Sequence, residues 1–239
     1  HPRPSSMAIT DRNGNTANRR SVCLEPWICQ PTMPAKTDII ESGLASSAHP
    51  QRMRLSAIDR VIRGTGLFRW QLRGKLRGLM RASLQDPWRG DLTNGRDILS
   101  HRLDPLGDAA YFQSFEWIRD LRVEGGSDAR ARARDLITGW VDSNQRWQLP
   151  DWRPDIMGRR LAVLALNYGW YGHSAPEQFQ DNLSAALDMQ LNCLATDWRR
   201  MRSAEDQISA LRGLALAEVA FGISQEKFAA LLDLIMPKL

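Results

Sequence analysis

Apolar residues recur at intervals of three and four along the second half of the chain, which is the spacing of an amphipathic helix. In the first such stretch Phe112, Phe115, Ile118 and Leu121 lie on adjoining turns. The same spacing continues almost to the last residue. It predicts helices over residues 109–123, 129–141, 154–171, 179–194 and 208–220, and a last helix between Ser224 and Pro237.

Residues that start and stop helices stand at the ends of these stretches. Caps are predicted at serines whose hydroxyl can accept a hydrogen bond from a first-turn backbone N–H: Ser127, Ser174, Ser203 and Ser224. Glu177 and Asp206 follow two of these serines by three residues, as in a capping box. The Gly125–Gly126 pair stops the first helix, and Pro154 suits the first turn of another.

The predicted helices are joined by short connections, so consecutive helices are expected to pair antiparallel as αα-hairpins. No stretch of useful length alternates between apolar and polar residues as a strand would. The sequence therefore predicts an all-α fold of antiparallel αα-hairpins, either a bundle or an arc of a larger α/α toroid. No exact internal repeat is visible, which argues against a regular solenoid.

The first fifty residues have a different composition. Residues 1–50 are rich in Ser, Thr, Asn, Pro and Arg and have few periodic apolar positions. Such a segment cannot offset the conformational entropy that ordering would remove. We expect a disordered N-terminal tail over residues 1–50 and a helical domain over residues 51–239.

Positive charge is concentrated in residues 51–85. This segment carries nine basic residues and one acid, Asp59, whereas the whole chain has a net charge of +5. Its apolar residues recur at about helical spacing between glycines, which predicts a broken, basic, amphipathic helix or a pair of helices. Such a segment can bind nucleic acid or an anionic membrane surface. Alternatively, the segment packs on the other helices and keeps its guanidinium groups in water.

The chain shows no convincing set of catalytic or metal-ligating residues. No spacing of His, Cys, Asp and Glu matches a zinc or calcium site, and no glycine motif would cradle a phosphate, so neither metal nor cofactor is expected. Three cysteines cannot make a full disulfide framework. No apolar run approaches the ~20 residues of a membrane span, and no signal peptide is visible. The compartment therefore stays open.

Several sequence blocks, taken in order, carry a family resemblance. They are DPWRGD at 86–91, FEWIRDLR at 115–122, ARARDLITGWV at 131–141, WRPDIMGRRL at 152–161 and LRGLALAEVAF at 211–221. In this order they resemble the N-terminal helical domain of bacterial heparinase II/III-like proteins, over roughly residues 62–239.

The resemblance implies an α/α toroid, followed in complete members by a β-sandwich domain. It also implies a polysaccharide lyase that cleaves uronic-acid polymers by β-elimination, in which a base removes a proton beside a neutralised carboxylate. The family's catalytic Asn, Tyr and His lie beyond the block at 211–221, so no catalytic residue is assigned here. We expect the β-sandwich to be absent and the chain to be inactive alone. The family further suggests a periplasmic location.

Four residues are candidate contacts for an anionic polysaccharide: Trp117, Trp152, Arg153 and Arg160. Indole rings suit the apolar faces of sugars, and guanidinium groups bind carboxylates and sulfates through paired hydrogen bonds. The alternative for the tryptophans is core packing, and for the arginines a solvated face or pairing with nearby acids. Trp152 and Arg153 precede Pro154 in a predicted loop, which favours a functional role for them.

A second function class is a non-enzymatic helical module that binds an anionic partner through residues 51–85. Nucleic acid is the less favoured partner under the family resemblance. A partial toroid would also leave apolar faces uncovered in the last helix, at Phe228, Leu231, Leu232 and Ile235. Self-association of the chain is therefore expected.

Overall fold

The computed structural model describes residues 53–72, 80, 84–103 and 110–238, and the structural statements below refer to these ranges. All of them belong to one compact unit of the chain, Lys36–Leu239. The tail predicted over residues 1–50 lies outside the described residues. The same is true of residues 51–52, 73–79 and 81–83 of the basic segment.

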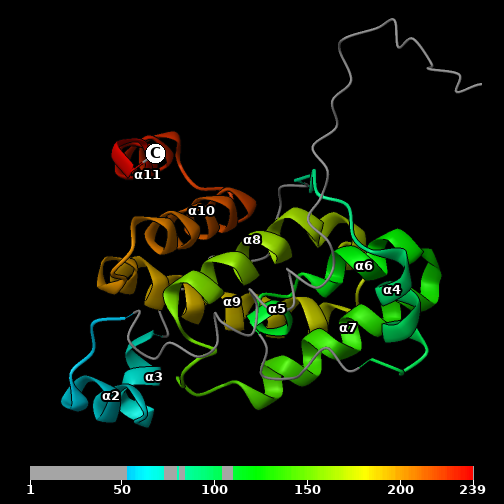
Figure 1. Cartoon of the computed structure of the whole chain (residues 1–239), viewed down its shortest axis with the longest axis horizontal. Helices are drawn as coiled ribbons and strands as arrows, with labels where there is room; N and C mark the ends of the chain where they lie inside the picture. Colours follow the sequence, from blue (N-terminus) through cyan, green and yellow to red (C-terminus); the bar gives the residue numbers. More distant parts are fainter. Residues whose placement is uncertain (1–52, 73–79, 81–83, 104–109, 239) are drawn as a thin grey trace, which may run out of the picture. The chain divides into compact units, whose positions relative to one another are not determined.

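Every regular element in the described ranges is a helix, which confirms the prediction of an all-α fold (Figure 1). The α-helices are α2 (Ala57–Arg63), α3 (Gly66–Leu72), α4 (Leu92–Leu99), α5 (Ala110–Gln113), α6 (Trp117–Glu124), α7 (Gly126–Ser143), α8 (Pro154–Tyr171), α9 (Glu177–Asp197), α10 (Ala204–Ala220) and α11 (Gln225–Ile235). The 3₁₀ turns η2 (Trp198–Arg200) and η3 (Met236–Lys238) follow α9 and α11. Of these helices, none combines the length and the hydrophobicity that a membrane span requires.

Several predicted helix ends are confirmed. Pro154 occupies the first turn of α8, and this helix ends at Tyr171. The hydroxyl groups of Ser203 and Ser224 each accept a hydrogen bond from the backbone N–H three residues later, at the starts of α10 and α11. The local rules for proline and serine are therefore sufficient at these three helix starts.

Two predicted caps are wrong. Ser127 lies inside α7, because Gly125 takes the N-cap position with a φ of 78° that only glycine adopts freely. The hydroxyl of Ser174 accepts a hydrogen bond from Arg134, and α9 begins after Pro176 instead. In both places the backbone preference of another residue, a glycine at positive φ or a proline, decides the start of the helix.

The single helix predicted over residues 109–123 is also wrong, because the chain breaks between α5 and α6. Phe115 lies at the break with a φ of 65°, a conformation that bulky residues rarely adopt. Its ring is fully buried, and its centroid lies 5.2 Å from the centroids of both Trp117 and Trp140. Aromatic packing in the core therefore accompanies the break in this helix.

Helix α8 contacts α6, α7, α9 and α10, and nearly all of its side chains are buried. Its most extensive contact is with α10 (Figure 1). Gly158 of α8 and Gly213 of α10 meet there, and a Cβ on Gly213 would lie 2.0 Å from the carbonyl oxygen of Gly158. The two helices approach so closely that neither position can hold a side chain without moving them apart.

The last helix is only partly covered. Leu231 of α11 is buried in the core, whereas Leu232 and Met236 are exposed. The predicted apolar patch at this end of the chain is thus smaller than expected, and self-association through it stays a prediction.

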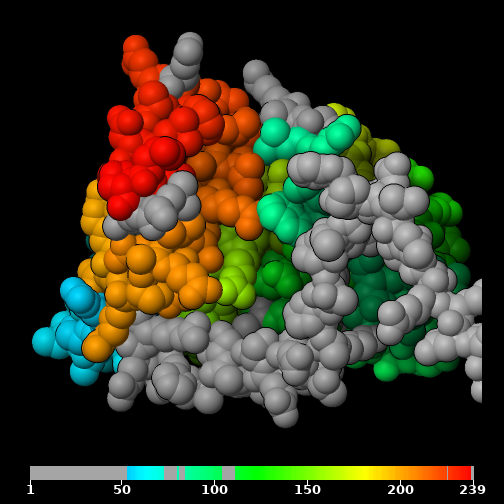
Figure 2. Space-filling model, turned by 45° about the horizontal axis from the view of Figure 1, so that its top comes forward, coloured from blue at the N-terminus to red at the C-terminus, as the bar shows by residue number. Residues whose placement is uncertain are grey.

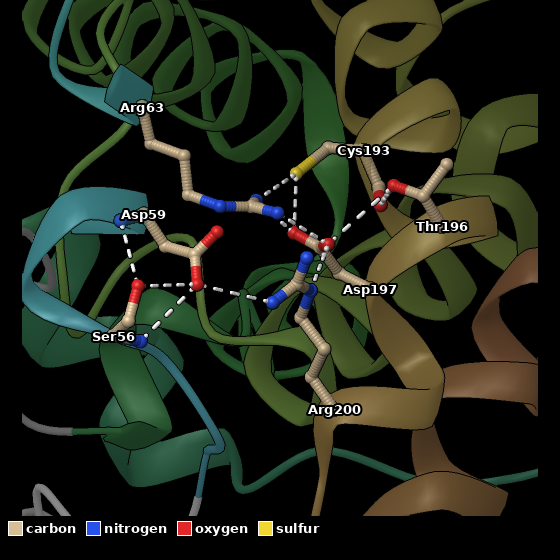
Figure 3. A network of polar contacts seen from close by, with 7 residues as sticks. All are labelled: Ser56, Asp59, Arg63, Cys193, Thr196, Asp197 and Arg200. Carbon is tan, nitrogen blue, oxygen red and sulfur yellow. Dashed lines mark hydrogen bonds and ion pairs between the residues drawn. The ribbon is translucent and has the colours of Figure 1, made fainter. Parts of the chain in front are cut away.

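A buried ion pair fastens α2 to α9 (Figure 3). The Arg63 guanidinium donates two hydrogen bonds to the Asp197 carboxylate, which has no exposed surface. Arg200 approaches the same carboxylate, with its Nε 3.2 Å from Asp197 Oδ1. The Cys193 thiol donates to Asp197 at 3.2 Å, and burial raises the pKa of this thiol well above its ordinary value. One buried carboxylate is therefore the shared partner of two guanidinium groups.

The described part of the basic segment forms two short helices, α2 and α3, which agrees with the alternative of a pair of helices. Ser56 and Asp59 make a reciprocal capping box at the start of α2, and Asp59 Oδ2 lies 3.5 Å from Arg200 Nη1. The backbone N–H of Arg54 donates to the Arg200 carbonyl at 2.8 Å. Figure 2 shows α2, in cyan, beside the segment around η2, in orange.

We expect Gly213→Ala to lower the free energy of unfolding by about 3 kcal/mol, because the added methyl group forces α8 and α10 apart. Urea denaturation followed by tryptophan fluorescence measures the change. Gly66→Ala is the matched control, because its Cβ meets nothing within 4 Å. Equal denaturation midpoints for the two variants would contradict the tight α8–α10 contact.

We expect Asp197→Asn to lower the free energy of unfolding by about 3 kcal/mol, because Arg63 and Arg200 lose their shared carboxylate. Limited trypsin digestion should also cleave α2 faster in this variant. Glu124→Gln is the control, because it breaks an ion pair to the exposed Arg96, and such a pair is worth under about 1 kcal/mol. Unchanged digestion of α2 would show that the ion pair does not hold this helix.

Candidate functional site

A groove of about 450 Å³ opens between the end of α7, the loop that follows it and the middle of α9. Aromatic, amide and charged side chains line it: Trp140, Trp152, Asn144, Gln145, Asn182, Gln190, Asp142, Asp188 and Arg69. Ala185 and Ala186 of α9 also line the groove, and their small side chains leave room for a ligand. We refer to this feature as the α7–α9 groove.

Two tryptophans with little exposed surface stand in the wall of the groove. Trp140 belongs to α7, and its Nε1 donates to Gln113 Oε1 at 2.8 Å, which fixes the plane of its ring. Trp152 lies in the loop before α8, where its backbone N–H donates to the Gln148 carbonyl at 2.9 Å. Both rings are therefore held in position before any ligand arrives.

Two buried hydrogen-bond donors of groove-lining residues have no partner among the described residues. They are Trp152 Nε1 and Arg69 Nε. Arg69 comes from α3, and its Nη2 donates to Gln145 Oε1 at 2.8 Å across the loop after α7. A buried donor without an acceptor costs about 1–3 kcal/mol. Any acceptor that reached either donor would relieve this cost.

Arg160 lies directly behind the wall of the groove and has no exposed surface. Its Nε donates to Gln190 Oε1 at 2.8 Å, and its two terminal nitrogens donate to the carbonyls of Gln113 and Asp151 at 2.9 Å. Its guanidinium also stacks over the Trp140 ring, 4.1 Å from the centroid. Arg160 therefore holds together four parts of the chain that build the groove.

Burial lowers the pKa of the Arg160 guanidinium to about 9, and the nearby Asp151 partly counteracts this shift. The group is protonated at neutral pH. A buried cation requires every N–H to find an acceptor or an aromatic face, and the contacts of Arg160 supply both.

The side chains of the groove suit the recognition of a hydroxylated ligand. Asn144, Gln145 and Asn182 can each donate and accept hydrogen bonds, Asp142 is an exposed acceptor, and Arg69 supplies a positive charge. Within the described ranges, no group of three metal-ligating side chains is present. The groove therefore offers hydrogen bonding and aromatic surface to a ligand.

The four predicted contact residues lie in three different environments. Trp152 lines the α7–α9 groove, and Arg160 supports the groove from behind. Arg153 makes two hydrogen bonds to the Asp155 carboxylate, at 2.6 and 2.9 Å, beside the start of α8. Trp117 is fully buried, and its Nε1 donates to the Phe112 carbonyl at 3.1 Å. The structure thus brings two of the four residues to one place, and contact with a sugar stays a prediction for each.

The sequence did not single out Arg69 or the amides of the groove. Arg69 meets Gln145 across a separation of 76 residues, so no local pattern could connect them. The same holds for the bond between Arg160 and Gln190, which are 30 residues apart. Of the residues that build the groove, the sequence pointed only to Trp152 and Arg160.

Comparisons with known proteins found no family model, no curated protein and no solved structure that matches this chain. The arguments about function therefore rest on the residues and their geometry.

We expect Arg160→Lys to lower the free energy of unfolding by about 3 kcal/mol, because one ammonium cannot reach acceptors in three directions. Urea denaturation measures this loss. Arg96→Lys is the control at an exposed arginine that pairs with Glu124. A wild-type midpoint for Arg160→Lys would show that its contacts do not hold the groove together.

Proposed function

We propose that this chain is a helical module that binds a uronate-containing polysaccharide in the α7–α9 groove. In this proposal it is the N-terminal helical part of a heparinase II/III-like polysaccharide lyase, which cleaves such polymers by β-elimination. The catalytic residues and a C-terminal β-sandwich domain would come from polypeptide outside this sequence. The chain alone is then a binding unit without lyase turnover.

The observation that carries the proposal is the pair of unpartnered donors at the groove, Trp152 Nε1 and Arg69 Nε. A uronate residue presents both hydroxyl and carboxylate oxygens, which accept hydrogen bonds from such donors. The Arg69 guanidinium suits a planar carboxylate in particular. The indoles of Trp140 and Trp152 add the apolar surface that the C–H face of a sugar ring requires.

The packing of the helices supports the toroid part of the proposal. Helices next to each other in sequence contact each other from α6 to α11. Alternate helices also contact each other: α6 with α8, α7 with α9, and α8 with α10. Two layers of alternating helices produce this pattern, and such layers are the building plan of an α/α toroid. The buried α8 would belong to one layer, and the groove would lie along the other.

A second candidate function is attachment to an anionic membrane surface through α2 and α3. Large apolar side chains of these two helices are at least half exposed: Ile58, Val61, Ile62, Leu67 and Trp70. They share the segment in which basic residues outnumber acids by nine to one. Exposed apolar groups beside arginines suit a lipid interface better than the backbone of a nucleic acid.

The sugar-binding proposal is tested by isothermal titration with heparin and alginate oligosaccharides, with neutral dextran oligosaccharides for comparison. We expect the uronate-containing oligosaccharides to bind and dextran not to bind. Trp152→Phe should weaken binding by about tenfold, because it removes the Nε1 donor and keeps most of the ring.

Trp147→Phe is the matched control, because its Nε1 is also buried without a partner among the described residues, but Trp147 does not line the groove. Equal affinities of the two variants, or equal binding of dextran, would contradict the proposal. Co-sedimentation with phosphatidylglycerol vesicles that is lost in Trp70→Ser, without oligosaccharide binding, would favour the membrane function instead.

A further inference from the structure

The turn at residues 86–91 is fixed against α6. A Cβ on Gly90 would lie 2.2 Å from the backbone of Arg119, so the two backbones are in direct contact. Arg122 Nη2 donates to the Asp86 and Trp88 carbonyls at 3.3 and 2.7 Å. The backbone N–H of Asp91 donates to Asp120 Oδ1 at 2.6 Å. This turn therefore presents its side chains from a rigid base.

A second cavity, of about 280 Å³, lies between this turn, α6 and α8. Polar and aromatic side chains line it, among them Asp86, Arg122, Asn167 and Trp170. It shares no lining residue with the α7–α9 groove. We refer to it as the Asn167 pocket.

The amide of Asn167 has a defined orientation and a free acceptor. Its Nδ2 donates to Asp86 Oδ2 at 2.9 Å and to the Val163 carbonyl at 2.8 Å, and both of these partners are acceptors. The amide cannot be turned round without placing its oxygen against them. Asn167 is 2% exposed, and its Oδ1 has no partner among the described residues. The pocket thus contains a buried acceptor that requires a donor.

Asp86 does not oppose an anion in this pocket, because its charge is already neutralised. Arg119 Nε lies 2.7 Å from Asp86 Oδ2. Burial tends to raise the pKa of Asp86, but the hydrogen bonds from Arg119 and Asn167 outweigh it, and the pKa lies below its ordinary value. Asp86 is consequently a carboxylate at neutral pH that serves as an acceptor within the protein.

Two charged side chains of the described residues line the pocket, Asp86 and Arg122, and Asp86 is paired with Arg119. Arg122 uses only Nη2 for the turn, which leaves the N–H donors on Nη1 and Nε without partners in the described ranges. Arg212 of α10 stacks on Trp88, 4.4 Å from the ring centroid, beside the turn that Figure 2 shows next to α10. Burial and the positive charge of Arg119 lower the pKa of Arg212, and the carboxylates of Asp86 and Glu116 partly counteract this shift.

We propose that the Asn167 pocket binds a small hydroxylated carboxylate. A ligand hydroxyl donates to Asn167 Oδ1, the ligand carboxylate accepts from Nη1 and Nε of Arg122, and the carbon skeleton packs on Trp170. The ligand is either a free hydroxy acid or the terminal acidic residue of a chain, since both present the same groups. The site is separate from the α7–α9 groove and does not rest on the function proposed for it.

Isothermal titration with D-gluconate tests the pocket. We expect gluconate to bind, whereas glucose lacks the carboxylate and cyclohexanecarboxylate lacks the hydroxyls, so each should bind about tenfold more weakly. A heparin tetrasaccharide distinguishes the sources: competition with gluconate indicates a chain end, and its absence indicates a free acid. Lack of gluconate binding to the wild-type protein, or equal binding of glucose, would overturn the proposal.

Variants assign the binding to this pocket. Arg122→Gln should weaken gluconate binding by about tenfold, whereas Arg96→Gln, a matched loss of charge on exposed α4, should leave it unchanged. Trp170→Ala keeps the polar contacts of Asn167 and should weaken binding about threefold with an intact melting transition. Trp152→Phe should have no effect, which separates the two sites. Equal affinity of Arg122→Gln and Arg96→Gln would exclude Arg122 as the anion contact.

Discussion

Helix α8 has almost no surface in contact with solvent, and this constraint determines how the surrounding helices are arranged. A helix buried on all sides cannot leave its polar side chains to water, so each of them must find partners on other elements. Arg160 finds them at the end of α5, in the loop before α8, and on α9. Asn167 finds them on the turn at 86–91 and within α8. The two candidate ligand sites lie where these polar groups meet the neighbouring helices.

The two sites differ in the kind of group that is left without a partner. The α7–α9 groove has spare donors on Trp152 and Arg69, whereas the Asn167 pocket has a spare acceptor beside an arginine. The groove therefore favours ligands with acceptor groups, and the pocket favours ligands that carry both a donor and an anionic group. Molecules rich in oxygen can supply these groups. The exposed apolar residues of α2 and α3 differ from both sites. Their binding free energy would come from the burial of apolar surface and not from hydrogen bonds.

The helices from residue 154 onward could be predicted from the sequence, because their apolar spacing and the caps at Pro154, Ser203 and Ser224 agree. The failures have identifiable physical causes. Gly125 and Pro176 fixed helix starts through their backbone preferences, and the chain breaks at Phe115, whose ring packs in the core. The site residues were harder to predict, since each depends on at least one partner that is 30 or more residues away, such as Gln190 for Arg160 and Asp86 for Asn167.

The ion pair between Arg63 and Asp197 joins residues that are 134 positions apart. During synthesis at ~5–20 residues per second, on the order of 10 s passes between the emergence of α2 and that of its partner on α9. Throughout this interval the basic, apolar segment has no native docking surface. Native docking of α2 therefore waits until α9 has emerged, whereas the exposed apolar residues of α2 and α3 stay accessible before and after docking.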